Sequence, residues 1–228
     1  MAGFEANMDY QAARKYMVAS QVRPNDVTDL ALQKALEAVP REKFLPAHLR
    51  DIAYVEREHV YGATEGAQRV LLMARDFAKL LAVAKPRPVD HVLDVACGTG
   101  YSTAILANLC EMVIGLESDE KMRTKAQSLL SDLSIDNTAI VDGDVTAGDA
   151  AQGPYDLIVI AAAIAREPTN LLEQLKLGGR LVTIWRQGKA DKGVMFRRSE
   201  NSLSRVPYFD AGASHVLAPF AAEKEFQF

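Results

Sequence analysis

The sequence contains only two cysteines, Cys97 and Cys110, among its 228 residues. Neither cysteine stands at a metal-ligand spacing from another potential ligand, and the four histidines are scattered along the chain. A disulfide-stapled scaffold and a zinc module are therefore excluded, and we expect no metal site. We expect both thiols to be reduced and buried, as is usual in a cytoplasmic protein.

Long hydrophobic runs and an excess of positive charge are also missing. No window approaches the 18 uninterrupted apolar residues of a membrane span, and the first twenty residues lack the pattern of a signal peptide. The net charge of −4 gives no sign of the basic face that nucleic-acid-binding proteins carry. We therefore expect a soluble, cytoplasmic protein that binds neither nucleic acid nor membrane.

The composition is that of a globular protein, with 49% hydrophobic and 25% charged residues. A chain of this length buries roughly 70% of the surface of its unfolded state, which is enough to fold without disulfides or metals. We expect one domain over residues 1–228, in which 1–84 form an N-terminal helical elaboration and 85–228 form the core. Apolar spacing predicts N-terminal helices, and a polar stretch predicts a loop. The helices are expected at 9–23, 28–39 and 69–84, and the loop at 56–67.

From residue 90 onward, short apolar runs alternate with helical segments. This alternation predicts an α/β fold with a Rossmann-like, doubly wound and mostly parallel sheet. Two further segments near the end, 193–198 and 203–209, predict an antiparallel edge. The parallel strands are expected at 91–95, 113–116, 139–141, 157–160 and 181–185. The helices between them are expected at 100–109, 119–133 and 168–176, with Gly178-Gly179 as the signal that ends the last one.

A glycine turn joins the first of these strands to a helix. Asp94 lies at the strand end, and Gly98 and Gly100 follow it, so the backbone can approach a ligand closely. A dinucleotide site favours a third glycine at the position that Thr103 occupies. An acid such as Asp94 also suits a positively charged sulfonium and amino group better than a pyrophosphate.

Two further acids stand at the ends of the next strands. Glu117 follows the second strand, where a carboxylate can accept the hydroxyl groups of a ribose. Asp144 follows the third strand, where a carboxylate can accept an adenine amino group. Together with the glycine turn, these acids predict a nucleoside pocket for S-adenosylmethionine.

Several segments together resemble the protein-L-isoaspartate O-methyltransferase family over nearly the full length. The block 40–46 with Ala53-Tyr54 is similar to its N-terminal signature, 92–101 to its cofactor motif and 143–144 to its third-strand motif. The segments 155–162 and 168–182 are similar to its later blocks. The resemblance implies a class I methyltransferase that uses S-adenosylmethionine, releases S-adenosylhomocysteine and methylates an isoaspartyl carboxylate in damaged protein. It also implies cofactor contacts beside the acids and glycines, from Ala96, Ser118, Val145 and Ala161.

The resemblance fails at the acceptor site. The family places a serine in a Thr-hydrophobic-Ser-Gln-Pro segment, and ungapped counting back from Asp94 puts Leu72 at its position. A leucine cannot donate a hydrogen bond to the acceptor. Other polar groups near the mouth are Thr64, Glu65 and Gln68, for which a solvated loop is the simpler interpretation, and His59. No catalytic residue is assigned.

Three functions therefore stay open at this stage. The first is isoaspartyl methylation of a protein or peptide, and the second is methylation of a different acceptor, such as a small molecule. The third is a regulatory module that binds the cofactor without turnover. Transfer to a small acceptor alone favours the second, and cofactor binding without any transfer favours the third. The sequence leaves the oligomeric state undetermined.

Overall fold

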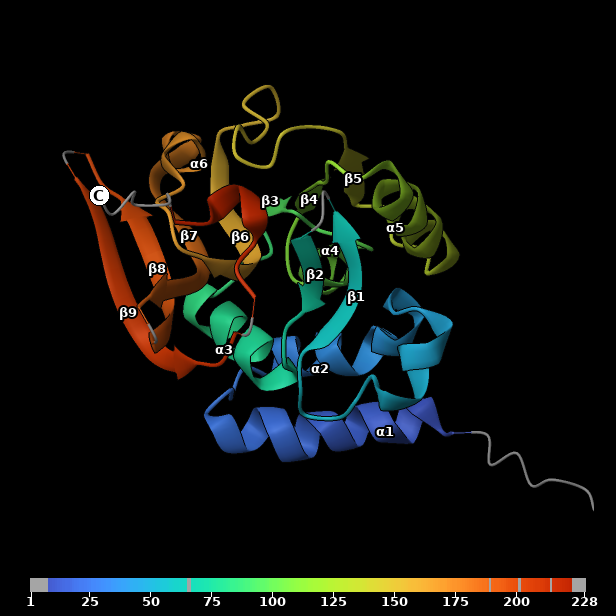
Figure 1. Cartoon of the computed structure of the whole chain (residues 1–228). Helices are drawn as coiled ribbons and strands as arrows, with labels where there is room; N and C mark the ends of the chain where they lie inside the picture. Colours follow the sequence, from blue (N-terminus) through green and yellow to red (C-terminus); the bar gives the residue numbers. More distant parts are fainter. Residues whose placement is uncertain (1–7, 65–66, 189, 201, 214, 223–228) are drawn as a thin grey trace, which may run out of the picture.

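The computed structural model describes residues 8–222, except 65–66, 189, 201 and 214 (Figure 1). Its centre is a seven-stranded sheet in the order β5-β4-β3-β6-β7-β8-β9. Strands β5, β4, β3, β6 and β7 run parallel to one another. Strand β8 is antiparallel to β7, and β9 is antiparallel to β8. Their bounds are β3 His91–Val95, β4 Met112–Leu116, β5 Thr138–Val141, β6 Tyr155–Ile164, β7 Leu175–Gln187, β8 Ala190–Arg198 and β9 Leu203–Ala211. This confirms the predicted, mostly parallel α/β sheet and its antiparallel edge.

Strand β3 is the point where the chain changes direction across the sheet. It pairs with β4 on one side and with β6 on the other. In open α/β sheets, ligands bind in the crevice at the carboxyl ends of the strands at such a point. The residues that follow β3, β4 and β6 are therefore the ones to search for a site.

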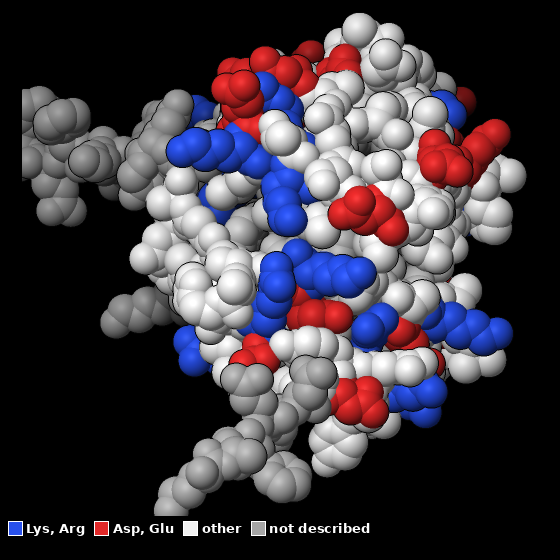
Figure 2. Space-filling model, turned by 90° about the vertical axis from the view of Figure 1, so that its right-hand side faces the viewer, with Lys and Arg blue, Asp and Glu red and all other residues white. Residues whose placement is uncertain are grey.

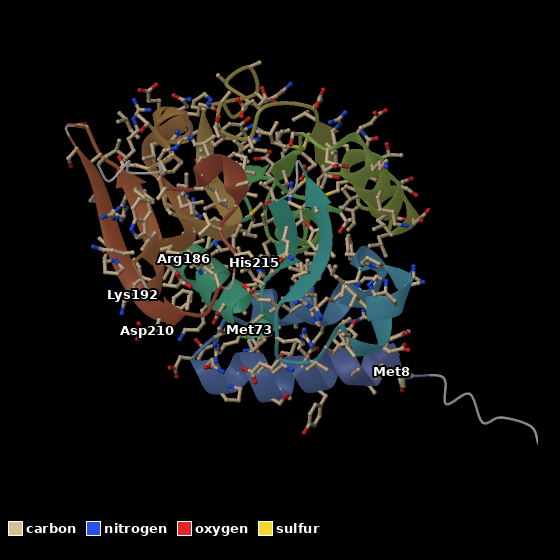
Figure 3. The ribbon with its side chains drawn as sticks, viewed as in Figure 1. Met8, Met73, Arg186, Lys192, Asp210 and His215 are labelled. Atoms are coloured by element: carbon tan, nitrogen blue, oxygen red, sulfur yellow. The ribbon has the colours of Figure 1, made fainter. Side chains whose placement is uncertain are left out.

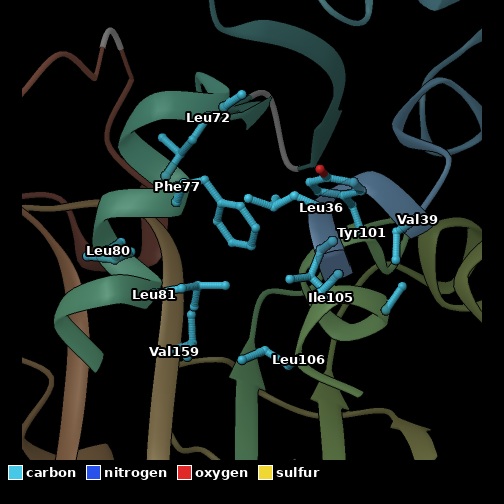
Figure 4. Packing of buried hydrophobic residues seen from close by; sticks show 14 of the residues in the cluster. Leu36, Val39, Leu72, Phe77, Leu80, Leu81, Tyr101, Ile105, Leu106 and Val159 are labelled. Carbon is cyan, nitrogen blue, oxygen red and sulfur yellow. The ribbon is translucent and has the colours of Figure 1, made fainter. Parts of the chain in front are cut away.

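Successive side chains of β3 point to two different cores, because side chains alternate along a strand. Val92 faces the core formed with the N-terminal helices, α3, α4 and α5, whereas Leu93 faces the core formed with α6 and the C-terminal segment. Figure 4 shows part of the first core, in which Leu72, Phe77 and Tyr101 lie between α3 and α4. The central helices are α3 Ala74–Ala84, α4 Tyr101–Ala107, α5 Glu120–Asp132 and α6 Thr169–Glu173.

Aspartate side chains fix the start of several helices. Asp29 accepts hydrogen bonds from the amides of Ala31 and Leu32 at the start of α2 (Leu30–Ala38). Asp119 accepts one from the amide of Met122 at the start of α5. Such caps satisfy amides that have no partner within the helix. The first predicted helix, 9–23, is α1 (Tyr10–Met17) continued by a π-helical and a 3₁₀ turn that reach Asn25.

The predicted loop at 56–67 is wrong, and so is the start of the helix predicted at 69–84. The segment contains a β-hairpin, with β1 His59–Thr64 and β2 Ala67–Leu71, and the helix begins only at Ala74. The two strands form a sheet of their own, separate from the central one. Figure 1 shows the hairpin extending from the N-terminal helices past α4.

The end of the helix predicted at 168–176 is also wrong. Helix α6 stops at Glu173, and Gly178 and Gly179 lie inside β7. The pairing of β6 with β7 shifts between Tyr155 and Leu157, so the two glycines mark an irregularity in a strand. A Cβ on Gly179 would lie 3.0 Å from the carbonyl oxygen of Tyr155, which explains why a strand position requires glycine here.

Charges of both signs are mixed on the side of the molecule that carries α5. Figure 2 shows lysine and arginine side chains between aspartate and glutamate side chains on this face. In the part of the chain that the structure describes, no helix is long and apolar enough to cross a membrane.

Candidate cofactor-binding site

The turn after β3 has the backbone conformation that its glycines predict. Gly98 and Gly100 have φ values of 60° and 91°, and Ala96 has a φ of 56°. Ala96 stands where the cofactor motif of the family that the sequence resembles usually has a glycine, and a side chain in this left-handed region is strained. The amide of Cys97 donates to the carbonyl of Leu116 and thereby ties the turn to β4.

Glu117 lies directly after β4 with its side chain fully buried. Its carboxylate accepts hydrogen bonds from the amide of Gly98 at 2.8 Å and the amide of Asp119 at 3.0 Å. The structure thus brings Glu117 to the glycine turn, as the sequence predicts. These two hydrogen bonds hold the carboxylate in a fixed position beside the glycine turn.

A third partner of Glu117 was not predicted. Arg69 of β2 forms a two-pronged ion pair with the carboxylate, in which Nη1 lies 2.9 Å from Oε1 and Nη2 contacts Oε2. The Nη2 atom also donates to the carbonyl of Ala96 at 2.9 Å. The side chain of Arg69 is 6% exposed, so this guanidinium lies inside the site.

Tyr61 of β1 is the second hairpin residue at the turn. A Cβ placed on Gly98 would collide with its hydroxyl group, so Tyr61 lies directly on the glycine. Burial raises the pKa of Tyr61 to about 12. Two small cavities, of about 20 and 30 Å³, remain beside it and are lined by Leu72, Ala96 and Ala161.

Asp94 is buried behind the turn rather than at its mouth. Its Oδ2 atom accepts hydrogen bonds from the hydroxyls of Ser102 and Thr103 on α4, each at 2.6 Å. Burial raises the pKa of Asp94 to about 6, and the two hydroxyls oppose the shift. Its Oδ1 atom is buried without a hydrogen-bond partner among the described residues, so one acceptor is left for a donor that enters the site.

The remaining predicted contacts lie around the same edge of the sheet. Asp144 is exposed, and its Oδ1 atom accepts from the amide and hydroxyl of Thr146, which lower its pKa. Ser118 is exposed, Val145 is buried against the second core, and Ala161 is half-buried. The structure therefore brings Gly98 into direct contact with Glu117, and Arg69 links both Glu117 and the carbonyl of Ala96, whereas Asp144 caps its own turn.

The acceptor side of the site is apolar at the position that the family gives to serine. The Leu72 side chain is 3% exposed and packs in the core of Figure 4. Its carbonyl accepts a hydrogen bond of 2.6 Å from Arg41, whose guanidinium also lies 5.0 Å from the ring centre of Tyr101. Arg41, in the block 40–46, thus holds the backbone just after β2.

Of the alternative polar groups named from the sequence, Gln68 lines a small cavity together with Leu72. Gln68 is exposed and His59 is buried, and burial with the charges of Arg41 and Arg57 lowers the pKa of His59 to about 4. Glu65 and the side chain of Thr64 lie outside the described residues.

His215 is a residue that sequence reasoning missed. It was one of four scattered histidines, but the structure places it at the smaller cavity together with Leu72, Gln68 and Arg69. Figure 3 labels His215 and Met73 in this part of the molecule. The sequence carries no signal for this, because about 140 residues separate His215 from the hairpin.

The side chains that could bind a metal do not cluster in the described part of the chain. No group of three or more histidine, cysteine, aspartate or glutamate side chains comes together in a way that could hold a metal ion, within the described ranges. Cys97 and Cys110 are both free and buried, as predicted. Burial raises the pKa of Cys110 to about 12, so its thiol is inert at neutral pH.

Comparison with known proteins identifies the family. The model of the family "Protein-L-isoaspartate(D-aspartate) O-methyltransferase" matches residues 13–208. The protein-L-isoaspartate O-methyltransferase of Yersinia enterocolitica is 34% identical over 194 residues, which are 85% of this chain and 91% of that protein. The one of Pelotomaculum thermopropionicum is 33% identical over 183 residues, 79% of this chain and 78% of that protein.

Solved structures show the same fold at lower identity. A protein-L-isoaspartate O-methyltransferase matches 93% of this chain and 66% of its own with a TM-score of 0.74 and 20% identity. A putative enzyme of that name from Plasmodium falciparum, solved with S-adenosyl-L-homocysteine, matches 90% of this chain and 98% of its own with a TM-score of 0.72 and 19% identity. The resemblance seen in the sequence motifs is thus confirmed, and the chain belongs to the protein-L-isoaspartate (D-aspartate) O-methyltransferase family of S-adenosylmethionine-dependent methyltransferases.

Proposed function

We propose that this chain methylates an isoaspartyl carboxylate in a protein or peptide. The observation that carries the proposal is the buried Glu117 carboxylate, which receives the amide of Gly98 across the glycine turn at 2.8 Å. This pairing joins the ends of β3 and β4 into one nucleoside-recognition element at the edge where ligands of open α/β sheets bind. Family membership supports the isoaspartyl acceptor.

The residues of this element suit the cofactor in their chemistry. Glu117 carries two acceptor oxygens of the kind that ribose hydroxyls need, although Arg69 and two amides occupy them in this structure. Gly98 has no Cβ, so a ligand could approach its backbone closely where Tyr61 now lies. The unpartnered Oδ1 atom of Asp94 suits a cationic donor. We propose that Asp144 accepts the adenine amino group, with Ser118, Val145 and Ala161 lining the nucleoside. When bound, S-adenosylmethionine supplies an electrophilic methyl group on a sulfonium.

The reaction does not require a general base. An isoaspartyl carboxylate is ionised at neutral pH, so its oxygen can attack the methyl carbon without a general base. The carbon–sulfur bond breaks with its electron pair going to sulfur, and a methyl ester forms. The chain must therefore align the reactants and provide partners for a carboxylate that leaves water.

Leu72 supports a second candidate function. Its buried side chain gives no hydrogen bond to an acceptor, whereas its apolar surroundings suit a less polar acceptor. Methylation of a small molecule with an apolar body is therefore the alternative. A cofactor-binding module without turnover is the third possibility, since the acceptor side departs from the family pattern at Leu72.

The test is methyl transfer from labelled S-adenosylmethionine to an isoaspartyl peptide, with the matching aspartyl peptide as the control substrate. The proposal predicts label in a base-labile ester of the isoaspartyl peptide alone. Label only in small acceptors would replace it with the second function. Cofactor binding without transfer to any acceptor would favour the third.

A further inference from the structure

The β1–β2 hairpin places two side chains on the groups that the proposed function assigns to the cofactor. Arg69 contacts Glu117 and the carbonyl of Ala96, and Tyr61 lies on Gly98. Neither residue belongs to a motif by which the sequence resembles the family. The inference below rests on the proposed function, because it assigns Glu117 to the ribose.

The Glu117 carboxylate is already saturated with hydrogen bonds. Its Oε1 atom accepts from Arg69 and from the amide of Asp119, and its Oε2 atom accepts from Arg69 and from the amide of Gly98. A carboxylate has about four lone-pair sites, so no site is left for a ribose hydroxyl. The ribose and Arg69 therefore compete for the same two oxygen atoms.

The space above the turn is also filled. The Tyr61 hydroxyl occupies the position that a Cβ on Gly98 would take. The cavities left around Tyr61 measure about 20 and 30 Å³. Sites for ligands of nucleoside size or larger usually enclose about 300–1,000 Å³. The hairpin must therefore withdraw before the nucleoside can reach Glu117.

The hairpin is built so that it can move as a unit. Among the described residues, β1 pairs with β2 and neither strand pairs with the central sheet, so withdrawal leaves the ladder of that sheet intact. Arg69 and Tyr61 hold the hairpin at the glycine turn, and it also packs against β6, against Met122 of α5 and, through Leu71, against the first core. If the hairpin is withdrawn in only a fraction of the molecules, the apparent affinity for the cofactor falls in proportion to that fraction.

We propose that the β1–β2 hairpin is an autoinhibitory gate, in which Arg69 takes the place of the ribose on Glu117 and Tyr61 covers the glycine turn. Cofactor binding and the Arg69–Glu117 ion pair then exclude each other. A substitution that removes the guanidinium opens the site and strengthens cofactor binding, although it removes a polar group from the pocket.

The test is calorimetric titration with S-adenosylhomocysteine of the wild type, Arg69→Ala and the control Arg57→Ala. Arg57 is exposed and donates only to the carbonyl of Glu58 among the contacts of its side chain that the structure gives. We expect Arg69→Ala to lower the Kd at least tenfold and Arg57→Ala to leave it unchanged. An unchanged or higher Kd for Arg69→Ala, with a wild type that binds, overturns the gate and leaves the proposed function standing.

Failure of the proposed function gives a different result. If neither the wild type nor Arg69→Ala binds S-adenosylhomocysteine, while Arg69→Ala retains the wild-type circular dichroism, the nucleoside site itself is refuted and the gate with it. If Arg69→Ala does not fold, hydrogen exchange of the wild type decides. The gate predicts faster exchange of the amides of β1 and β2 at saturating S-adenosylhomocysteine, and slower exchange would overturn it.

Discussion

Replacing Glu117 by glutamine should reveal how much the buried ion pair contributes to stability. The substitution keeps the shape of the side chain but removes the charge that Arg69 faces, at a site where the two side chains are 0% and 6% exposed. Breaking a buried pair whose remaining charge stays buried costs about 3–5 kcal/mol. Because the hairpin is separate from the central sheet, it can carry Arg69 to water, so we expect a smaller loss of about 2 kcal/mol.

The two partners should not be equivalent. When Arg69 is replaced by methionine, Glu117 keeps the amides of Gly98 and Asp119, whereas Glu117→Gln leaves the buried charge of Arg69 without its anionic partner. We therefore expect Glu117→Gln to cost more than Arg69→Met, and the double variant to lie within about 1 kcal/mol of the wild type.

Urea unfolding followed by circular dichroism measures these differences. The matched control is Glu111→Gln, an exposed glutamate just before β4, which should change the free energy of unfolding by less than about 0.5 kcal/mol. If Glu117→Gln behaves like this control, or if the double variant is as unstable as the sum of the two single ones, the pair is not the interaction described here.

Three further predictions follow from other parts of the structure. His59 is buried with its pKa lowered from 6.5 to about 4, so the stability it contributes is fully present above pH 6.5 and declines as pH falls toward 4, by up to about 3 kcal/mol. Stability measured against pH should therefore be flatter for His59→Gln in this range, and an identical slope would contradict the prediction. Leu72→Ser should raise the rate of isoaspartyl methylation if that hydroxyl alone is missing, and no gain in the labelled-methyl assay would show that the acceptor loop differs more widely. Asp29→Ala removes the cap of α2 and should cost about 1 kcal/mol in thermal unfolding, while Asp29→Asn should cost clearly less.

The central sheet could be predicted from the sequence because its signals are local. The buried parallel strands are short apolar runs such as 91–95 and 113–116, and the structure has β3 and β4 there. Glu117 could be placed for the same reason, since a residue that follows a parallel strand lies at the carboxyl edge of the sheet. The position of Asp144 followed from the same rule, but its hydrogen bonds to Thr146 depend on the local turn.

The hairpin could not be predicted in this way. Gly62 interrupts its first strand at a register shift, and Val70 and Leu71 continue the apolar pattern of the helix that follows, so the segment resembles a loop joined to a helix. A usable signal was the pair of short segments with β-branched or aromatic residues, 59–61 and 69–71, on either side of Gly66. Nothing local indicates that Arg69 reaches Glu117, because 48 residues separate them and only the fold brings them together.

The crystal structure of the chain with S-adenosylhomocysteine bound tests the central claim most directly. The account predicts that both ribose hydroxyls donate to Glu117 and that Arg69 and Tyr61 have left the glycine turn. A nucleoside bound elsewhere, or one that leaves the Arg69–Glu117 ion pair intact, would contradict it.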